Sequence, residues 1–315
     1  MILSIGTVDE RVHERLSAHG EVVEVDARDG AAIARWLPDA VGIVARATAV
    51  IDAAVIDAAP QLRVIGRSGV GVDRVDVDAA TRRGIPVVIT TNAGTRGVAE
   101  GALALILHLV KRLGPMTRLV RDGHWNERDA FPLGDLDGAT LAVIGYGRIG
   151  RRLAELAAVL GMRVIAHDPY AGEVDVPLMD LPSALSEADV ISLHAPLTPA
   201  TQGLIGAEAL RHVKPGAVLV NCGRGGLLDL DAAHAALLDG RLAGVGLDVF
   251  EPEPPADHPL FHLPDVVLTP HVMALSRRTS ARVFEEMADG MDDVLSGRRA
   301  PSVANPDVYD TARTP

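Results

Sequence analysis

The sequence predicts an α/β protein in which a doubly wound parallel sheet is inserted into a smaller α/β unit. Short, continuously apolar segments rich in β-branched residues alternate with longer segments of helical periodicity. This alternation is typical of parallel sheets whose two faces are covered by crossover helices. Two such series follow one another along 315 residues, a length that favours two domains. Long helical segments flank the second series, which favours its insertion into the first.

The first series supplies five expected strands, at Ile2–Ile5, Val22–Val25, Val41–Ala45, Arg63–Gly66 and Val87–Ile89. Helical patterns lie between them, at Val8–Ala18, Ala31–Trp36 and Ala53–Ala58. Strands that alternate with helices in this way predict parallel pairing within one sheet.

The second series supplies six expected strands, at Leu141–Ile144, Arg163–Ala166, Val190–Leu193, Val218–Val220, Gly244–Leu247 and Val266–Leu268. The flanking helical segments are Gly97–Leu113, continued by Pro115–Asp122, and Ser276–Leu295. We therefore expect residues 95–275 to form the inserted domain and residues 1–94 plus 276–315 the outer one. The tail from Arg298, rich in Pro, Asp and Thr, is expected to be frayed or draped on the surface.

Composition excludes several classes of function. Thirty basic and 42 acidic residues give a net charge of −12, which argues against a nucleic-acid partner. Cys222 is the single cysteine, so neither an internal disulfide nor a Cys-rich metal site can form, and we predict no metal. No run approaches the ~18 apolar residues of a membrane span. The N-terminus resembles a strand rather than a signal peptide, so we expect a cytoplasmic protein without a membrane partner.

A glycine-rich turn follows the strand Leu141–Ile144. Gly145, Gly147 and Gly150 have the spacing G-x-G-x-x-G, and the helix Ile149–Leu160 follows. Gly145 makes a tight turn, Gly147 lets the backbone approach a pyrophosphate, and Gly150 permits close packing of helix on strand. The positive end of the helix then faces the phosphates. This context predicts a Rossmann nucleotide-binding domain.

The next strand ends in Asp168, 18 residues after Gly150, where a carboxylate can accept hydrogen bonds from ribose hydroxyls. No Arg or Lys follows it directly, and a carboxylate alone repels a 2′-phosphate. We therefore expect NAD rather than NADP. Arg148 and Ile149, inside the glycine loop, are included among the expected cofactor-binding residues.

Three further segments follow expected strands and carry an arginine, acidic residues and a histidine. Val220–Gly226 contains Arg224, Leu247–Pro254 contains two glutamates, and Leu268–His271 ends in the histidine. Because the carboxyl ends of parallel strands meet at one edge, these groups should converge beside a bound nicotinamide.

These segments resemble the D-isomer-specific 2-hydroxyacid dehydrogenases, most closely the phosphoglycerate dehydrogenase branch. The resemblance covers most of the chain and, besides the glycine loop, rests on Gly66–Asp73, Asp78–Val87, Arg121–Trp125, His194–Pro199, Asn221–Asp229 and Gly246–Pro254. It implies that the outer domain is a flavodoxin-like substrate domain.

The resemblance also implies roles for the three converging groups. Arg224 matches the arginine that binds the substrate's carboxylate and carbonyl oxygen, for which a bidentate guanidinium is suited. His271 matches the acid/base that takes or gives the proton of the C2 oxygen. Glu253 matches the carboxylate that orients this histidine, although Glu251 is an alternative partner for it.

Further positions are implied in the same way. Beside the nucleotide lie His194, Pro196, Cys222 and Asp248, with Asp248 near the nicotinamide carboxamide and Cys222 as a neutral wall residue. In the substrate domain, Arg46 faces the substrate, and Val70 and Gly71 offer backbone donors to its carboxylate.

The expected activity is NAD-dependent oxidation of a D-2-hydroxy acid or the reverse reduction, with phosphoglycerate favoured as the substrate. Val272–Leu275 is bulkier and more apolar than the branch usually has, and Gly97 stands where Ser or Thr is usual. A glyoxylate or hydroxypyruvate reductase is therefore the alternative enzyme. The alternative of another class is an NAD-sensing binding protein without turnover. We expect a homodimer, with the Ala- and Leu-rich segment Ala99–Leu109 as its contact.

Overall fold

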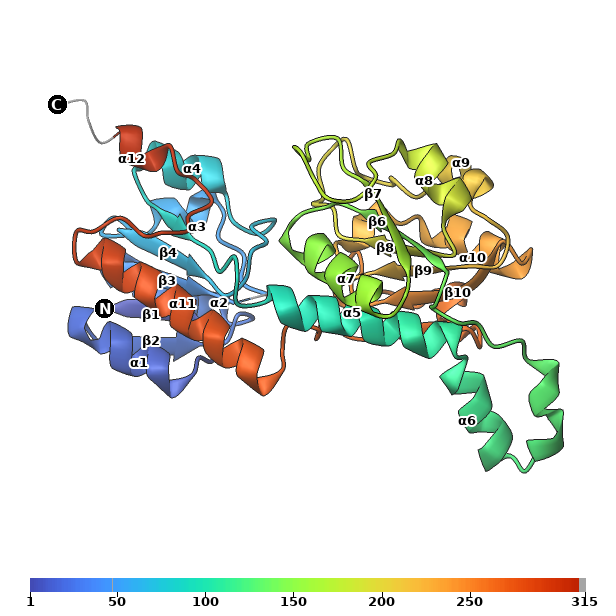
Figure 1. Ribbon diagram of the computed structural model, residues 1–315. Helices are drawn as coiled ribbons and strands as arrows, with labels where there is room; N and C mark the ends of the chain where they lie inside the picture. The colour runs from blue at the N-terminus through green and yellow to red at the C-terminus, as the bar shows by residue number, and fades with distance from the viewer. Residues whose placement is uncertain (47, 312–315) are drawn as a thin grey trace. The chain divides into compact units, whose positions relative to one another are not determined.

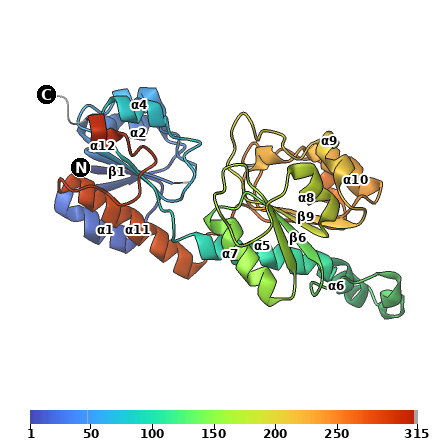
Figure 2. The same ribbon diagram turned by 45° about the horizontal axis from the view of Figure 1, so that its top comes forward.

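The chain folds into two compact units, each an α/β sandwich (Figures 1 and 2). Unit 1 comprises Met1–Gly94 together with the chain from Ser276 on, and unit 2 comprises Thr95–Leu275. The computed structural model describes residues 1–46 and 48–311. Ala47, next to the expected substrate-binding residue Arg46, lies outside the described residues.

Unit 1 is built on a five-stranded, fully parallel sheet. Its strands are β1 (Ile2–Ile5), β2 (Val22–Val25), β3 (Gly42–Ala45), β4 (Val64–Arg67) and β5 (Val87–Val88), in the order β2-β1-β3-β4-β5. This is the flavodoxin-like order. All five strands were expected from the sequence, and the predicted α/β class is confirmed.

Alternate residues of these strands point to opposite faces, and different helices cover each face. Ile2, Val44 and Val64 pack under α1 (Glu10–Leu16) and α11 (Arg277–Leu295). Leu3, Ile43 and Ile65 pack on the other side with the remaining helices before residue 94, which are α2 (Gly30–Trp36), α3 (Ala53–Asp57) and α4 (Val77–Arg82).

The tail was expected to be frayed or draped on the surface, but its described part is anchored to unit 1. The buried Asn305 accepts a hydrogen bond of 2.8 Å from the Val87 N–H and donates one of 2.9 Å to the Ile85 carbonyl. Val303 pairs antiparallel with Val88, and a final helix, α12, spans Val308–Thr311. The tail therefore completes the edge of the unit 1 sheet through residue 311.

Unit 2 contains a six-stranded parallel sheet. Its strands are β6 (Thr140–Ile144), β7 (Arg163–His167), β8 (Val190–Leu193), β9 (Ala217–Asn221), β10 (Leu242–Leu247) and β11 (Val266–Leu268). The order is β11-β10-β9-β8-β6-β7. The chain reverses direction across the sheet between β6 and β8, the switch point at which doubly wound folds bind ligands.

Two layers of helices cover the unit 2 sheet (Figure 1). α5 (Thr95–Val110) and α7 (Arg148–Val159) pack on Leu141, Val143 and Val220. The opposite face, which includes Ala142 and Ile144, is covered by α8 (Leu181–Glu187), α9 (Ala207–His212) and α10 (Leu230–Leu238). α6 (Leu113–Arg121) begins after Arg112, whose positive φ of 47° ends the preceding helix.

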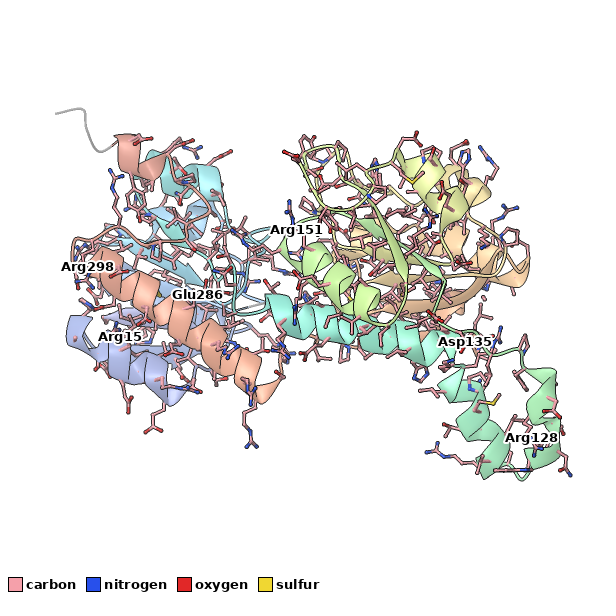
Figure 3. The ribbon with its side chains drawn as sticks, viewed as in Figure 1. Arg15, Arg128, Asp135, Arg151, Glu286 and Arg298 are labelled. Atoms are coloured by element: carbon pink, nitrogen blue, oxygen red, sulfur yellow. The ribbon has the colours of Figure 1, made fainter. Side chains whose placement is uncertain are left out.

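The acidic excess has a structural use at helix N-termini. In the described part of the chain, six helices have an aspartate at the N-cap whose side chain accepts a hydrogen bond from a backbone N–H of the first turn. These caps are Asp9, Asp29, Asp52, Asp76, Asp180 and Asp229. Each such cap contributes about 1 kcal/mol. Asp292 on α11 instead pairs with Arg15 on α1, with His19 just after α1, and with Arg298 beyond the end of α11. Arg15 and Arg298 are labelled in Figure 3. Within residues 1–46 and 48–311, no helix has the length and apolar character required to cross a membrane.

Candidate active site

The glycine loop lies at the sheet's switch point and opens α7. Gly145 has a φ of +94°, and a β-carbon there would lie 2.5 Å from the backbone nitrogen of Ala195, which follows β8. A β-carbon on Gly150 would collide with the Gly145 carbonyl, so the helix can start this close to the strand only with glycine. Gly147 is the N-cap, and the space where its β-carbon would be is open.

The two other loop residues begin α7. Arg148 is exposed and Ile149 is half-buried, packing against the core under α5 and α7. Because Gly147 has no side chain to cap the helix, the first N–H groups of α7 remain for a ligand. An exposed helix N-terminus with this glycine spacing suits a pyrophosphate.

Asp168 directly follows β7 and turns both carboxylate oxygens toward backbone donors. Oδ2 accepts from the Tyr146 N–H and Oδ1 from the Tyr170 N–H, each at 2.9 Å. The carboxylate is therefore held beside the glycine loop. Tyr146 itself is buried, and its hydroxyl donates to Asp175 at 3.1 Å. This second link joins the glycine loop to the segment after β7 and was not predicted from the sequence.

His194 and Pro196 follow β8, next to the glycine loop. The His194 N–H donates to the Ile144 carbonyl at 2.7 Å, and its Nε2 lies 2.8 Å from the Ser192 hydroxyl. Its Nδ1 is buried without a hydrogen-bond partner among the described residues. Burial lowers the pKa of His194 to about 4, so the ring is neutral near pH 7. Pro196 is exposed, and its carbonyl accepts from Thr201.

Arg224 lies in a loop shaped by the buried Asn221 at the end of β9. The Asn221 amide donates to the Arg224 carbonyl at 2.8 Å and accepts from the Gly223 N–H at 3.0 Å. The Arg224 guanidinium donates to the Gly223 carbonyl at 2.8 Å. Asn221 was not singled out from the sequence, although an asparagine ending an apolar strand is the available signal.

Asp248, at the end of β10, is buried and holds the segment that carries His271. Its Oδ1 accepts from the Thr269 hydroxyl at 2.7 Å and the Val272 N–H at 2.9 Å, and its Oδ2 from the Met273 N–H at 3.3 Å. Burial, reinforced by the Asp248 charge, raises the pKa of the Cys222 thiol, which keeps this wall residue neutral.

His271 and Glu253 are brought into direct contact. The His271 Nδ1 lies 2.9 Å from Glu253 Oε2 and 3.1 Å from Oε1. Burial raises the pKa of Glu253, but hydrogen bonds from His271 and the Phe250 N–H, with the Arg224 charge, outweigh it and leave that pKa below its usual range. The Glu253 carboxylate is therefore ionised. Glu251, the alternative partner, lies elsewhere, against Gly226.

The backbone of His271 has a φ of 52°, a conformation that non-glycine residues rarely adopt. The His271 N–H donates to the Asp248 carbonyl at 2.8 Å and to the Thr269 carbonyl at 3.0 Å, which fixes this turn. Nε2 has no partner among the described residues, so this nitrogen is available to a ligand.

The three expected residues of unit 1 lie after its strands. Arg46 follows β3, donates to the Thr7 carbonyl at 2.7 Å and stacks over the Phe284 ring at 5.2 Å. Val70 and Gly71 lie in the loop after β4. Their backbone N–H groups make no hydrogen bond to another described residue, so both remain available as donors.

Comparison with known proteins identifies the family. Residues 103–273 match the family model described as the D-isomer specific 2-hydroxyacid dehydrogenase, NAD binding domain. The chain belongs to this family. The match covers the glycine loop, Asp168, Arg224, Glu253 and His271.

Similar proteins differ in their named substrates. The chain is 39% identical to the D-3-phosphoglycerate dehydrogenase of Mycobacterium leprae over 307 residues, covering 95% of this chain but 58% of that relative. It is 40% identical to the glyoxylate reductase of Korarchaeum cryptofilum, covering 86% and 84% of the two chains. The crystal structure of the TT0316 protein from Thermus thermophilus superposes with a TM-score of 0.90 at 39% identity, covering 96% and 99%.

The residues of this 2-hydroxyacid dehydrogenase family member fit NAD. The open space at Gly147 leaves room for a pyrophosphate, and the uncapped N-terminus of α7 supplies donors for it. Asp168 supplies acceptors for a ribose, and the unpartnered Nδ1 of His194 is a further polar group at the switch point. These features, together with the family match, indicate NAD as the cofactor of this unit.

Proposed function

We propose that this protein is an NAD-dependent oxidoreductase that interconverts a D-2-hydroxy acid and the corresponding 2-oxo acid. The observation that carries the proposal is the Glu253–His271 pair, whose imidazole has one nitrogen bound and the other available, in a chain of the 2-hydroxyacid dehydrogenase family. The intact pair beside Arg224 weighs against the binding-protein alternative, because sensing NAD does not require an acid/base.

His271 is assigned as the acid/base. In oxidation, Nε2 takes the proton of the C2 hydroxyl as the C2–H bond breaks and the carbonyl forms. In reduction, the same nitrogen returns the proton to the carbonyl oxygen. Bound NAD supplies the acceptor or donor of the hydride. Glu253 accepts from Nδ1, which holds the ring and stabilises its charged form.

Arg224 is assigned to bind the substrate's carboxylate and its C2 oxygen. A planar guanidinium can donate two parallel hydrogen bonds to a planar 2-oxo acid. The Asn221 amide supports this assignment because it donates to the Arg224 carbonyl and accepts from the Gly223 N–H, which fixes the backbone of the turn. A positive charge next to the C2 oxygen stabilises the negative charge that develops there during reduction.

Val70, Gly71 and Arg46 are assigned to the substrate as well. The two N–H groups bind the carboxylate, and Arg46 binds a distal phosphate, as in 3-phosphoglycerate. Arginine must supply this charge because both lysines are engaged elsewhere: Lys111 pairs with Asp135 and Lys214 pairs with Asp189. The stack on Phe284 supports a fixed position for the Arg46 guanidinium.

Glyoxylate or hydroxypyruvate is the second candidate substrate. The apolar Val272 and Leu275, both exposed, favour a smaller or less charged substituent. The glyoxylate reductase relative, which this chain matches along most of its length, favours the same choice.

A panel of 2-oxo acids with NADH tests the function and separates the candidates. We expect turnover of 3-phosphohydroxypyruvate, and Arg46→Ala should raise KM for it far more than for glyoxylate. Efficient reduction of glyoxylate with no turnover of 3-phosphohydroxypyruvate would replace phosphoglycerate by the second candidate. Absence of turnover with every acid of the panel would contradict the enzyme assignment.

We propose a two-fold homodimer whose contact includes the exposed apolar side chains around α6 rather than the buried members of Ala99–Leu109. Ala99, Leu105 and Leu109 are buried within unit 2, so they are not available to a partner. α6 and the following turn, Trp125–Ala130, project from the end of α5 (Figures 1 and 2). They expose Leu113, Val120 and Trp125, and Leu133 is exposed just after them, so a second copy can cover these apolar side chains.

A further inference from the structure

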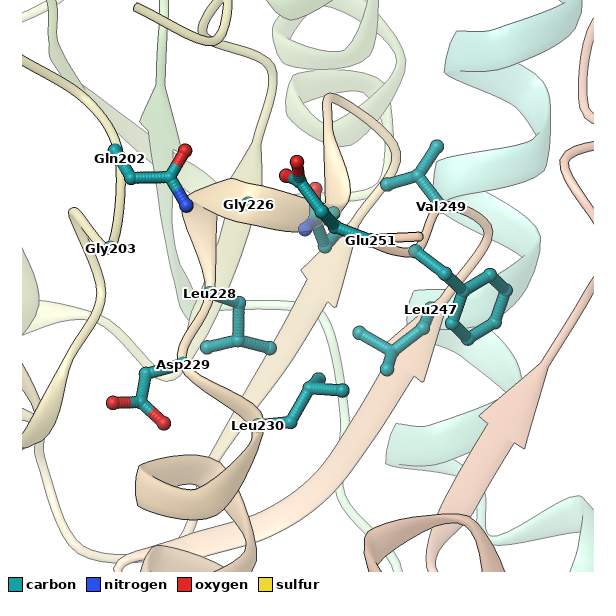
Figure 4. Close-up of a pocket in the computed structure, with 12 residues that line it drawn as sticks. Gln202, Gly203, Gly226, Leu228, Asp229, Leu230, Leu247, Val249 and Glu251 are labelled. Atoms are coloured by element: carbon teal, nitrogen blue, oxygen red, sulfur yellow. The ribbon is translucent and has the colours of Figure 1, made fainter. Parts of the chain in front are cut away.

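A cavity of about 330 Å³ lies between the loop that follows Arg224 and the segment that precedes Glu253 (Figure 4). Its walls come from the end of β9, the end of β10 and the turn at Gln202–Gly203, all in unit 2. The volume is at the lower end of the range for small-molecule pockets. None of the residues assigned above to the substrate or to NAD lines this cavity.

The inner wall is apolar. Leu228, Leu247 and Val249 line it and are buried, and the partly exposed Phe250 closes one side. Phe250 is held in an edge-to-face contact with Phe261, with ring centroids 5.6 Å apart. The cavity therefore has a preformed surface for a short hydrocarbon group.

Two polar side chains converge at the mouth, over Gly226. A β-carbon on Gly226 would lie in the space taken by the end of the Glu251 side chain, and 2.9 and 3.0 Å from the Oε1 and Nε2 of Gln202. The Glu251 carboxylate and the Gln202 amide therefore approach the same point over this glycine. Figure 4 shows them on either side of Gly226, with the leucine side chains below.

The negative charge of the lining residues determines which ligand fits the mouth of the cavity. Neither Glu251 nor the Gln202 amide has a hydrogen-bond or ion-pair partner in the described part of the chain. Asp229, which caps α10, is the other charged lining residue, and none of the described lining residues is Lys, Arg or His. An ammonium group can donate to a carboxylate and an amide oxygen at once, and the bond to the carboxylate is charge-assisted.

We propose that this cavity binds a small primary ammonium compound with a short aliphatic chain and thereby regulates the active site. The charged group lies between Glu251 and Gln202, and the chain lies on the apolar wall. Both acceptors already face the same point before binding, because Gly226 leaves that space open to them.

The cavity is coupled to the proposed catalytic residues through the backbone. A β-carbon on Gly225 would collide with Phe250, so the loop after Arg224 and the segment before Glu253 are in direct contact. The Phe250 N–H also donates to Glu253 at 3.1 Å. A ligand between the two segments shifts Arg224 and Glu253 relative to each other. This regulatory part rests on the proposed function, whereas binding does not.

Titration with n-butylammonium chloride tests the site. We expect a saturable rise in Tm and saturable heat in calorimetry, whereas n-butanol, which has the same shape without the charge, should bind at least tenfold more weakly. Glu251→Gln should weaken n-butylammonium binding about tenfold. Glu285→Gln, the same substitution at an exposed position of unit 1, is the matched control and should leave binding unchanged.

Leu230→Trp, which fills the cavity from its rim without touching Glu251, provides a second variant and should also weaken binding. Equal binding of n-butanol, or n-butylammonium binding that survives Glu251→Gln, overturns the site. Saturable binding that leaves kcat/KM for the 2-oxo acid unchanged overturns the regulatory coupling alone. If the protein binds n-butylammonium but turns over no 2-oxo acid, the site stands and the proposed function fails.

Discussion

Both carboxylate oxygens of Glu253 lie within hydrogen-bond distance of the same nitrogen of His271, Nδ1, at 2.9 and 3.1 Å. This arrangement holds the ring through Nδ1 and leaves Nε2 without a partner among the described residues. Under the proposed mechanism the two nitrogens have separate tasks, since Nδ1 is held by the carboxylate and Nε2 exchanges the proton.

Replacing His271 with alanine should lower kcat by about 10²–10⁴, the usual contribution of acid–base catalysis. The affinity for NADH should barely change, because His271 is not assigned to the nucleotide. Steady-state rates and a fluorescence titration of NADH measure the two effects. His262→Ala removes an exposed histidine paired with Asp257 and serves as the control. Full activity in the His271 variant would refute the mechanism.

The pH profile should identify the carboxylate that supports the histidine. The pKa of Glu253 is lowered, so the carboxylate stays charged until the pH falls below the usual range of glutamate. Glu253→Gln should move the alkaline limb of the reduction profile to lower pH, because the imidazolium loses its negative partner. Glu251→Gln is the matched comparison and should leave this limb in place. The opposite result would assign the role to Glu251.

Cofactor preference should depend on Asp168. The wild type should use NADH in preference to NADPH, and Asp168→Ala should narrow the difference in kcat/KM by removing both a ribose acceptor and a repulsive charge. Glu173→Ala removes an exposed carboxylate from the same segment and should leave the preference unchanged. A wild-type preference for NADPH would contradict the argument.

Stability in mild acid should depend on His194. Its pKa is about 4 in the folded protein, below the value near 6.5 expected on unfolding. The unfolded chain therefore binds more protons between these pH values, and the free energy of unfolding falls as the pH drops from 6.5 to 4. The loss is at most about 3 kcal/mol. Urea unfolding at pH 7 and pH 4.5 should show a smaller difference for His194→Gln, and an identical difference would rule out His194 as the cause.

Association should depend on the exposed side chains around α6. Light scattering at micromolar concentration should give twice the chain mass of 33.1 kDa. Val120→Asp and Trp125→Asp, at positions that are each 60% exposed, should dissociate the dimer. Val159→Asp, at an exposed position on α7, is the matched control. A wild-type particle of 33.1 kDa would contradict the proposal.

Local patterns predicted the strands and the ends from which the functional residues project. Arg224, Glu253 and His271 could be found because each lies a few residues after an apolar strand, and parallel strands place such positions at one edge. The resemblance favours Glu253, but the residues alone could not exclude Glu251, since both are glutamates that precede a proline. The deciding contact is between Glu253 and His271 Nδ1, and the Phe250 N–H, a backbone group without a sequence signal, helps to hold that carboxylate.

Contacts between distant segments explain why the position of the C-terminal tail and the burial within Ala99–Leu109 were not predicted from the sequence. Asn305 anchors the tail through Val87, more than two hundred residues away, and nothing around Asn305 indicates that partner. The Ala- and Leu-rich segment Ala99–Leu109 was expected to contact a second copy, but its buried members, such as Leu105 and Leu109, pack against α7 and β9 within the same unit. Periodicity shows that a face is apolar and does not show what covers it.

A ladder of backbone hydrogen bonds joins the loops after β9, β10 and β11. The Asp248 N–H donates to the Asn221 carbonyl at 3.0 Å, and the His271 N–H donates to the Asp248 carbonyl. The loops that carry Arg224, Glu253 and His271 are therefore held together by backbone atoms, whichever other side chains these loops contain. Val272 and Leu275 project from the same segment without entering that ladder. Over evolution, substitutions at such positions can change which 2-hydroxy acid is the substrate, while the backbone that carries the proposed acid/base is inherited unchanged.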